Sequence, residues 1–308
     1  MSKVKVLVCD AISADGIEEL KRADFEVDVN PTISNKLLVR AVPHYDALIV
    51  RSRTRVTKEI IETGKKLKAI GRAGVGLDNI DLETAEKRGI VVLNAPETPA
   101  DSVAELTIGL MISLARSIPL ADRTMKEGKW IKKELLGLEL RNKTLGIIGL
   151  GNVGRRVAKI AKALGMKILI TKRTPPAPEL LRELEAEFVL LKELLQSSDI
   201  VTIHVPLTPQ TKYMIGPQEI QLMKKGAFLI NTSRGAIVDE KALLKALKSR
   251  KLGGSALDVY EDEPPRNLKL MRLPNVVCTP HIGSQTLESQ WTEATILAKK
   301  LVKLLKID

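Results

Sequence analysis

The amino-acid sequence predicts an α/β fold with parallel sheets, divided into about two domains. Short β-branched apolar runs alternate with amphipathic segments along nearly the whole chain. That alternation is typical of βαβ units, whose parallel sheet is covered by helices on both faces. The length of 308 residues corresponds to about two domains at roughly 150 residues each.

In the first hundred residues we expect five strands separated by helices. The strands are predicted at Lys5–Val8, Phe25–Val29, Ala47–Val50, Lys68–Ile70 and Ile90–Leu93, and the helices at Ala14–Arg22, Asn35–Val42, Lys58–Gly64 and Leu82–Arg88. The helix predicted next, Ser102–Arg116, is apolar over most of its circumference. It is therefore expected to be buried on more than one side, between domains or against another subunit.

A second series of strands starts at Thr144. Its members are predicted at Thr144–Ile148, Lys167–Thr171, Phe188–Leu190, Ile200–His204, Phe228–Asn231, Ser255–Val259 and Val276–Thr279, with loops at Thr174–Pro178 and Glu263–Arg266. The last helix, about Thr286–Leu305, has no strand after it. It could fold back onto the first domain, which would make that domain discontinuous.

Composition excludes several classes of protein. With 44% hydrophobic and 28% charged residues, the chain is neither disordered nor collagen-like. The longest apolar stretch, around 106–115, is shorter than the roughly 18 residues of a membrane span. The first residues, MSKVKVLVCD, predict a buried strand and no signal peptide. Two cysteines, Cys9 and Cys278, predict neither a disulfide framework nor a zinc site. We expect a soluble, cytoplasmic protein without a metal.

The net charge of +12 favours anionic small molecules as partners. The first 100 residues have 16 Lys and Arg against 15 Asp and Glu, so nearly all of the excess lies in residues 101–308, spread over predicted helix surfaces. Aromatic residues make up only 3% of the chain, too few for a platform that stacks nucleic-acid bases. Nucleotides and phosphorylated acids account for the sign of the charge, so neither a nucleic acid nor a membrane is expected as a partner.

The strongest local signal is a glycine-rich turn. Gly149, Gly151 and Gly154 form G-x-G-x-x-G directly after a predicted strand and before the helix expected at Arg155–Leu164. The glycines permit a tight turn, close approach of the backbone to a pyrophosphate, and close packing of helix on strand. The helix N-terminus offers free N–H groups to the phosphates. A dinucleotide site is predicted here, with a merely structural turn as the alternative.

The residues after the next strand bear on which dinucleotide is bound. An acidic residue about 20 positions after the glycines would hold the ribose hydroxyls of NAD. The chain instead reads Lys172-Arg173-Thr174, with no carboxylate before Glu179. Cations there suit the 2′-phosphate of NADP, and a solvated loop is the alternative. NAD(H) and NADP(H) both remain open.

Hydride transfer to a carbonyl needs a proton donor, and histidine has the suitable pKa. The chain has three candidates. His44 lies in a predicted loop and is expected at the surface. His204 ends an apolar run, so it is either a core histidine or a group at the carboxyl end of the sheet. His281 follows a strand between Pro280 and Gly283, where α/β enzymes place functional groups.

Two neighbouring motifs strengthen the case for His281. Asn231-Thr-Ser-Arg-Gly235 puts Arg234 at the carboxyl end of a strand, where a guanidinium can bind a carboxylate with two parallel bonds. Leu257-Asp-Val-Tyr-Glu-Asp-Glu-Pro264 puts several carboxylates beyond another strand, and one of them could pair with the histidine. A surface ion pair and a solvated acidic loop are the alternatives.

With these motifs, the sequence resembles the D-isomer-specific 2-hydroxyacid dehydrogenases, and within them the D-3-phosphoglycerate dehydrogenases. The resemblance runs from end to end. It is carried by RSRTRVT at 51–57, GRAGVGLDNIDL at 71–82, DSVAEL at 101–106, GLGNVG at 149–154, HVPLTPQT at 204–211, NTSRGAIVD at 231–239, LDVYEDEP at 257–264 and TPHIGS at 279–284.

The resemblance implies two flavodoxin-like and Rossmann-like domains with the active site in the cleft between them. The substrate domain would be 1–98 with 285–308, and the dinucleotide-binding domain 99–284. Arg234 would orient the substrate, Glu263 would pair with His281, and His281 would act as general acid and base. Cofactor contacts would come from Gly149, Gly151, Asn152, Val153, Gly154, Lys172, Arg173, Thr174, His204, Pro206, Thr232 and Asp258. Substrate contacts would come from Arg51, Arg72, the Val75 and Gly76 amides, Lys132 and Arg234.

On this resemblance we expect a homodimer, joined across its Ser102–Arg116 helices, that oxidises 3-phosphoglycerate to 3-phosphohydroxypyruvate in serine biosynthesis. Two features depart from the family pattern: Lys172 stands near the place of the usual aspartate, and Pro99 where many members have Asn. The C-terminal regulatory domain of longer phosphoglycerate dehydrogenases is not expected after Asp308. The alternatives are an NADPH-dependent glyoxylate or hydroxypyruvate reductase and, from another class, a dinucleotide-sensing binding protein.

Overall fold

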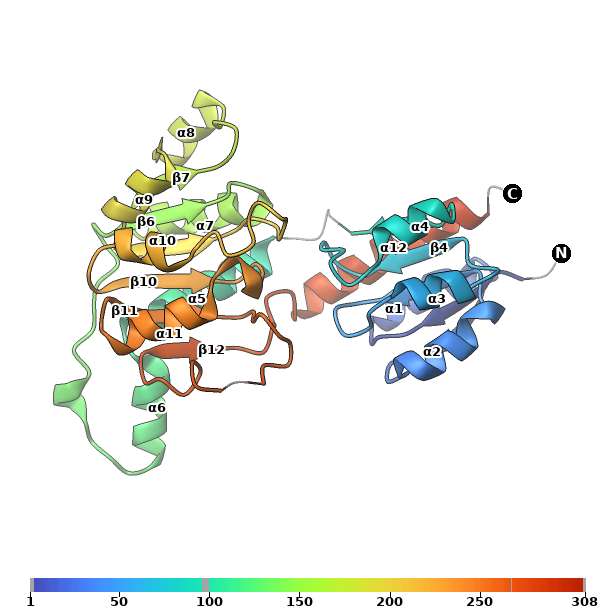
Figure 1. Cartoon of the computed structure of the whole chain (residues 1–308), viewed down its shortest axis with the longest axis horizontal. Helices are drawn as coiled ribbons and strands as arrows, with labels where there is room; N and C mark the ends of the chain where they lie inside the picture. Colours follow the sequence, from blue (N-terminus) through green and yellow to red (C-terminus); the bar gives the residue numbers. More distant parts are fainter. Residues whose placement is uncertain (1–2, 96–99, 267, 307–308) are drawn as a thin grey trace. The chain divides into compact units, whose positions relative to one another are not determined.

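The computed structural model describes residues 3–95, 100–266 and 268–306 (Figure 1). The chain forms two compact units, one from the residues before Ala100 together with those from Ser284 onward, the other Ala100–Gly283. The boundary expected between 98 and 99, and with it Pro99, lies outside the described residues. The second expected boundary, 284/285, is one residue from the observed one.

The first unit has a five-stranded parallel sheet in the order β2-β1-β3-β4-β5. Its elements are β1 (Lys5–Val8), β2 (Glu26–Val29), β3 (Ala47–Val50), β4 (Ala69–Arg72), β5 (Val91–Asn94), α1 (Ala14–Arg22), α2 (Asn35–Ala41), the 3-10 turn η1 (Val42–His44), α3 (Lys58–Thr63), α4 (Leu82–Lys87) and α12 (Leu287–Leu305). Helix α12 packs against α1, β4 and β5. The last helix therefore belongs to the first unit, as the lack of a final strand predicts.

The second unit has a seven-stranded parallel sheet in the order β12-β11-β10-β9-β6-β7-β8. Its strands are β6 (Thr144–Ile148), β7 (Lys167–Thr171), β8 (Ala186–Phe188), β9 (Ile200–Ile203), β10 (Ala227–Asn231), β11 (Leu252–Leu257) and β12 (Val276–Cys278). Its helices are α5 (Asp101–Ala115), α6 (Ile118–Lys126), α7 (Asn152–Ala163), α8 (Pro178–Leu184), α9 (Leu191–Ser197), α10 (Pro217–Leu222) and α11 (Glu240–Lys248), with 3-10 turns η2 (Lys132–Glu134) and η3 (Gly235–Ile237).

Alternate side chains of each strand enter different hydrophobic layers, as the pleat of a strand requires. In β6, Ile147 packs with α5 and α7, while Ile148 packs with α9, α10 and α11. In β1, Leu7 packs on one side of its sheet, while Val6 and Val8 pack on the other with α12. Both faces of both sheets are thus covered, which explains the nearly continuous apolar strands in the sequence. The expected fold class is confirmed.

Among the elements whose bounds differ from the sequence-based expectations are β8, β11 and α8. Strand β8 ends at Phe188 rather than starting there, because the apolar residues that follow lead into α9. Strand β11 starts at Leu252 rather than at Ser255. The prediction missed this start because Gly253 and Gly254 lack the side chains that mark a strand in sequence. Pro178 is the first residue of α8 rather than part of a loop, as its missing N–H allows.

No single helix of the described residues is long and apolar enough to span a membrane, and only α5 and α6 together, bent by 66°, meet that criterion. The apolar faces of α5 lie inside the second unit, against α7 and strands β10, β11 and β12.

Candidate functional site

The predicted cofactor and catalytic residues meet at one edge of the second sheet. Because all its strands run parallel, the residues that follow β6, β7, β9, β10, β11 and β12 lie at the same, carboxyl edge. These are the glycine turn at 149–154, Lys172–Thr174, His204–Pro206, Thr232–Arg234, Asp258–Glu263 and His281. The strand order reverses direction between β6 and β9, the position where open α/β sheets bind ligands.

The glycine turn between β6 and α7 has the geometry of a phosphate cradle. Gly149 adopts a φ of 96°, and a Cβ there would stand 2.5 Å from the His204 carbonyl oxygen. A Cβ on Gly154 would collide with the Gly149 carbonyl, so this glycine lets helix and strand pack closely. At Gly151 no atom lies within 4 Å of such a Cβ. The backbone at Gly151 is therefore open to a ligand.

Helix α7 presents its N-terminus at this opening. Gly151 is its N-cap, no side chain caps the first turn, and no acidic residue lies there. The first intrahelical bond runs from the Arg155 N–H to the Gly151 carbonyl at 3.0 Å. The N–H groups of Asn152, Val153 and Gly154 thus precede the helical ladder, and such groups bind anionic oxygens. The turn fits a dinucleotide pyrophosphate.

Two cations follow β7 at the same edge. Lys172 is half-buried, and Arg173 and Thr174 are exposed. Within the described part of the chain, neither cation forms an ion pair with an acidic residue, although such pairs are frequent elsewhere on the surface. The charge of both groups is therefore available to an anionic ligand, which fits the 2′-phosphate of NADP.

His281 and Glu263 form the central pair of the site. His281 Nδ1 lies 2.6 Å from Glu263 Oε2, and about one third of each side chain is exposed, 33% and 35%. Burial alone would raise the pKa of Glu263, but the hydrogen bond and charge of His281, the Tyr260 amide and the Arg234 charge bring it below its ordinary value. Glu263 is therefore a carboxylate at neutral pH, able to orient and charge-stabilise the imidazole.

The neighbouring carboxylate Glu261 has a different partner. Its Oε1 accepts from the Glu240 N–H at 3.3 Å, and Glu240 Oε1 accepts from the Glu261 N–H at 2.9 Å. Glu263 is held in turn by the Tyr260 N–H, 3.2 Å from Oε1. Of the two glutamates, the structure pairs Glu263 with His281, as predicted.

Asp258 braces the loop that carries His281. Its Oδ1 accepts from Thr279 Oγ1 at 2.6 Å and from the Ile282 N–H at 2.8 Å, and its Oδ2 accepts from the Gly283 N–H at 2.9 Å. His281 itself adopts a φ of 55°, an uncommon conformation for a residue with a side chain. The three bonds to Asp258 hold that conformation, while burial raises the pKa of Asp258.

Arg234 is positioned by the turn after β10. Asn231 Nδ2 donates to the Arg234 carbonyl at 2.8 Å, and Asn231 Oδ1 accepts from the Ser233 N–H at 3.1 Å. Arg234 Nη1 donates to the Ser233 carbonyl at 2.7 Å. The charge of Arg234 acts on Glu263, so the guanidinium and the His281–Glu263 pair share one region.

His204 and Thr232 lie deeper at this edge. His204 Nε2 is 3.0 Å from Thr202 Oγ1, and burial lowers the pKa of His204 to about 3. His204 is therefore neutral. Thr232 Oγ1 is 2.9 Å from Thr107 Oγ1 on α5. Both side chains can contribute only uncharged hydrogen bonds to a ligand.

The predicted substrate cations Arg51 and Arg72 lie in the first unit, after β3 and at the end of β4. In that sheet the order reverses between β1 and β3, so Arg51 stands at a topological switch point. Arg51 Nη2 is 3.3 Å from Glu293 Oε2 on α12. The loop with Val75 and Gly76 follows β4, and Asn94 Nδ2 donates to the Val75 carbonyl at 2.7 Å.

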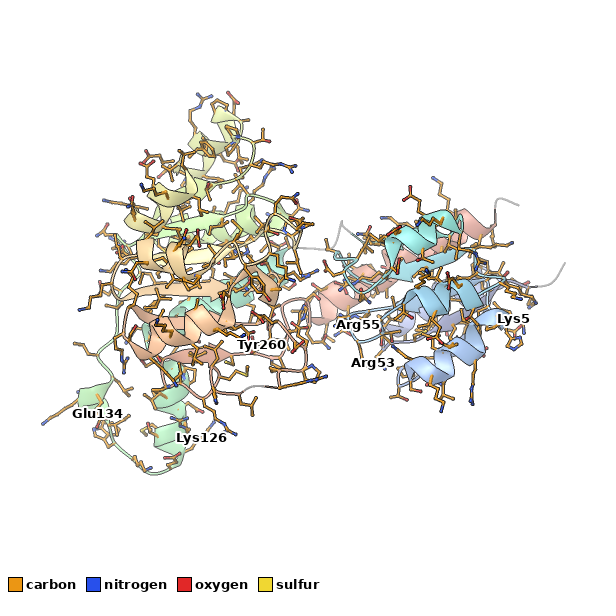
Figure 2. All side chains as sticks on the ribbon, in the orientation of Figure 1. Lys5, Arg53, Arg55, Lys126, Glu134 and Tyr260 are labelled. Carbon is orange, nitrogen blue, oxygen red and sulfur yellow. The ribbon has the colours of Figure 1, made fainter. Side chains whose placement is uncertain are left out.

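Lys132 is not brought to the carboxyl edge of its own unit. It starts η2, on a segment with α6 that projects from the other end of the sheet (Figure 1). Figure 2 labels Lys126 and Glu134 on this segment, far from Tyr260. The segment exposes large apolar side chains: Ile118, Met125, Trp130, Leu136 and Leu138.

Three residues that contact predicted site residues were not foreseen. Tyr260 Oη donates to the Thr279 carbonyl at 2.9 Å and ties the β11 loop to the β12 loop. Asn231 fixes the Arg234 turn. Glu293 is 2% exposed and faces Arg51. The burial of Glu293 could have been predicted from its spacing. It lies four residues from Ser289 and from Leu297, on the buried face of α12.

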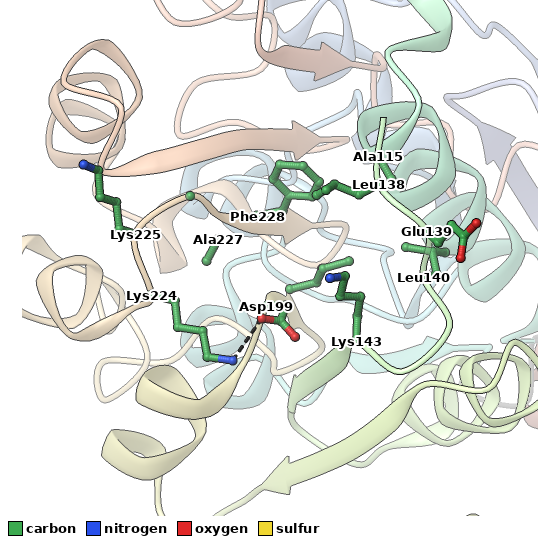
Figure 3. A pocket seen from close by; sticks show the side chains of 12 residues that line it. Ala115, Leu138, Glu139, Leu140, Lys143, Asp199, Lys224, Lys225, Ala227 and Phe228 are labelled. Atoms are coloured by element: carbon green, nitrogen blue, oxygen red, sulfur yellow. Dashed lines mark hydrogen bonds and ion pairs between the residues drawn. The ribbon is translucent and has the colours of Figure 1, made fainter. Parts of the chain in front are cut away.

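A further hollow lies at the opposite edge of the second sheet (Figure 3). Asp199 and Ala227, at the amino ends of β9 and β10, contribute to it, and Asp199 Oδ1 accepts from Lys224 Nζ at 2.9 Å. Because it opens at the amino ends of the strands, it is separate from the candidate active site.

Comparison with known proteins gives one consistent family. The family model described as D-isomer specific 2-hydroxyacid dehydrogenase, NAD binding domain, matches residues 108–283. A D-3-phosphoglycerate dehydrogenase of Methanocaldococcus jannaschii is 46% identical over 304 residues, covering 98% of this chain and 58% of the relative. A hydroxypyruvate reductase of Thermotoga maritima is 44% identical over 310 residues, covering both chains completely. The crystal structure of the TT0316 protein from Thermus thermophilus superposes with a TM-score of 0.90 at 35% identity, covering 98% of this chain and 97% of that one.

Proposed function

This chain belongs to the D-isomer specific 2-hydroxyacid dehydrogenase family, and from that premise we propose that it transfers a hydride between a nicotinamide dinucleotide and carbon 2 of a D-2-hydroxy acid. The observation that carries the proposal is the His281–Glu263 pair at 2.6 Å. It lies at the same strand edge as the phosphate cradle and Arg234. An acid–base group, an anion-binding guanidinium and a dinucleotide cradle are the parts that such a reaction needs.

Each part has a role in the proposed reaction. The bound dinucleotide supplies or accepts the hydride. In reduction, His281 Nε2 donates a proton to the carbonyl oxygen at carbon 2, and in oxidation it removes the hydroxyl proton. Glu263 orients the ring through Nδ1 and stabilises its protonated form. Arg234 binds the substrate carboxylate and the oxygen at carbon 2, and the Val75 and Gly76 amides hold the same carboxylate.

As the substrate we propose 3-phosphoglycerate, giving 3-phosphohydroxypyruvate in serine biosynthesis. Arg51 and Arg72 are the cations that would bind its phosphate, joined by Lys132 of a second copy, as anion recognition requires. The 46% identity to the dehydrogenase of M. jannaschii supports this choice. Because the chain spans 58% of the length of that relative, the activity of the whole relative is a proposal for this chain.

A second candidate is the NADPH-dependent reduction of hydroxypyruvate or glyoxylate. Two observations favour it. Arg51 is already bound to a buried carboxylate, Glu293, and Lys172 and Arg173 replace the acidic residue that selects NAD. The reductase of T. maritima, which matches the chain over its whole length, supports the same activity.

We further propose a homodimer. Trp130 is 77% exposed and Leu136 95%, on the projecting segment that also carries Lys132. Exposed apolar side chains gathered on one segment are typical of protein interfaces. Since α5 is covered within its own unit, this segment, rather than α5 alone, would supply the apolar contact. Lys132 lies away from the carboxyl edge of its own unit, so it would contact a substrate only in the site of a second copy.

The test is a comparison of initial rates for phosphohydroxypyruvate, hydroxypyruvate and glyoxylate, each with NADH and NADPH. A preference for the phosphorylated acid by about 100-fold in kcat/KM, or about 2.7 kcal/mol, would support 3-phosphoglycerate as the substrate. Equal or better turnover of glyoxylate would support the reductase. Absence of turnover with all three acids would refute the proposed activity.

A further inference from the structure

A buried carboxylate stands beside the proposed phosphate cations of the first unit. Glu293 Oε2 lies 3.3 Å from Arg51 Nη2, and the two side chains are 2% and 16% exposed. Burial raises the pKa of Glu293, and the charges of Arg51 and Arg72 oppose that rise. The ion pair with Glu293 offsets part of the charge of the Arg51 guanidinium, and the charge of Arg72 acts on the same carboxylate.

The structure holds Arg51 at this carboxylate. Its backbone N–H donates to Asp10 Oδ2 at 2.6 Å, and its carbonyl accepts from Asn79 Nδ2 at 2.6 Å. Its Nη1 lies 3.5 Å from Gln285 Oε1. Gln285 and Glu293 both come from the segment that starts at Ser284, so the returning end of the chain supplies the partners of the guanidinium.

This arrangement bears on substrate choice. A phosphate that binds Arg51 must share the guanidinium with Glu293, and its two negative charges would lie close to a third. An unphosphorylated acid brings no such charge to this position. In a buried setting, charges at about 4 Å interact by several kcal/mol, which is enough to change the ratio of two substrates many-fold.

We propose that Glu293 is a specificity-determining residue that lowers the preference of the Arg51–Arg72 site for phosphorylated over unphosphorylated 2-oxo acids. The inference rests on the proposed function, because it assumes that Arg51 and Arg72 face the distal end of the substrate. It explains why a chain with the cations for a phosphate also buries an anion against one of them. The native protein should therefore turn over hydroxypyruvate alongside phosphohydroxypyruvate.

The test is the substitution Glu293→Gln, which removes the charge and keeps the size and hydrogen-bonding groups. The ratio of kcat/KM for phosphohydroxypyruvate to that for hydroxypyruvate should rise by about tenfold or more, equivalent to about 1.4 kcal/mol. Glu288→Gln is the matched control, because Glu288 is an exposed carboxylate on the same helix, and its ratio should stay at the native value. An unchanged or lower ratio for Glu293→Gln would overturn the proposal.

A second measurement separates this inference from the proposed activity. Binding of inorganic phosphate, measured by titration calorimetry on the full chain, should be about tenfold tighter in Glu293→Gln than in the native protein. This readout needs no turnover, so it supports or overturns the role of Glu293 even where the activity proposal fails. If Glu293→Gln does not fold, Glu293→Met, which suits the apolar face of α12, should give the same tighter phosphate binding. Native-like phosphate affinity in the folded variant would again overturn the proposal.

Discussion

Replacing Glu263 by Gln tests how the carboxylate acts on His281. The substitution keeps an oxygen that can accept from Nδ1 and removes the negative charge. In the native protein the pKa of Glu263 is lowered, despite its partial burial, by the hydrogen bond and charge of His281. By reciprocity, the carboxylate stabilises the protonated imidazole. Without it, the positive charge that His281 carries during proton transfer should be less stabilised.

The size of the effect follows from the geometry. Nδ1 and Oε2 are 2.6 Å apart, and about one third of each side chain is exposed. At about 4 Å between charge centres, the attraction is about 1 kcal/mol in water and about 4 kcal/mol near a protein surface. Solvent screening of these partly exposed groups places the loss toward the lower figure. A loss of about 1.5 kcal/mol corresponds to about a tenfold lower rate.

The assay is kcat/KM in both directions at neutral pH. In each direction the transition state shares a proton between His281 and the substrate oxygen, so the imidazole carries positive charge there. Without the carboxylate, kcat/KM should fall about tenfold in Glu263→Gln. Glu261→Gln is the control, because Glu261 pairs with the Glu240 N–H instead of His281, and its kcat/KM should match that of the native protein. Native-like kcat/KM in Glu263→Gln would refute the proposed role.

Four further outcomes are expected. His281→Asn should lower turnover by roughly 100-fold or more while dinucleotide binding, followed by nicotinamide fluorescence, is retained; near-native turnover would rule out His281 as the acid–base group. Arg234→Ala should raise KM for the 2-oxo acid and lower kcat together, which unchanged saturation kinetics would contradict. Lys172→Asp should shift the kcat/KM ratio of NADPH to NADH toward NADH, because it restores an acceptor for the ribose hydroxyls, and a constant ratio would count against the NADP site. Leu136→Asp, at a side chain 95% exposed in one copy, should convert the dimer to a monomer in light scattering; a native protein that already has the mass of one chain would refute the dimer.

Much of the fold could be predicted because most strands are buried on both faces. Lys5–Val8, Thr144–Ile148 and Lys167–Thr171 coincide with the predicted strands, since each is a short run of mostly apolar, often β-branched residues. Strand β11 was misplaced because its first half is LGG, whose packing comes from neighbours rather than from its own side chains. Helix α6 and the η2 turn were not predicted, because their exposed apolar residues give no clean pattern in a single chain.

For the site, the sequence could predict which residues follow each strand. A parallel sheet puts such residues at one edge whatever their sequence separation, so Arg234 and His281 could be placed near each other. The partner of a given carboxylate could not be deduced this way. Glu261 and Glu263 are two residues apart, and only the loop after β11, pinned by Tyr260, turns the second one toward His281.

Asp258 and Glu263, two of the carboxylates after β11, differ in what their oxygens bind, and this separates a structural role from a proposed catalytic one. Asp258 is 1% exposed, and both its oxygens accept bonds from the β12 loop, so any contact to a nicotinamide carboxamide must use a remaining lone pair. Glu263 uses one oxygen for the Tyr260 amide and keeps the other for a titratable partner. Glu263 thus lies against the group that would carry the proton, whereas the three bonds to Asp258 fix where His281 stands. His281, the proposed acid–base group, is thus held in place by Asp258 and oriented by Glu263.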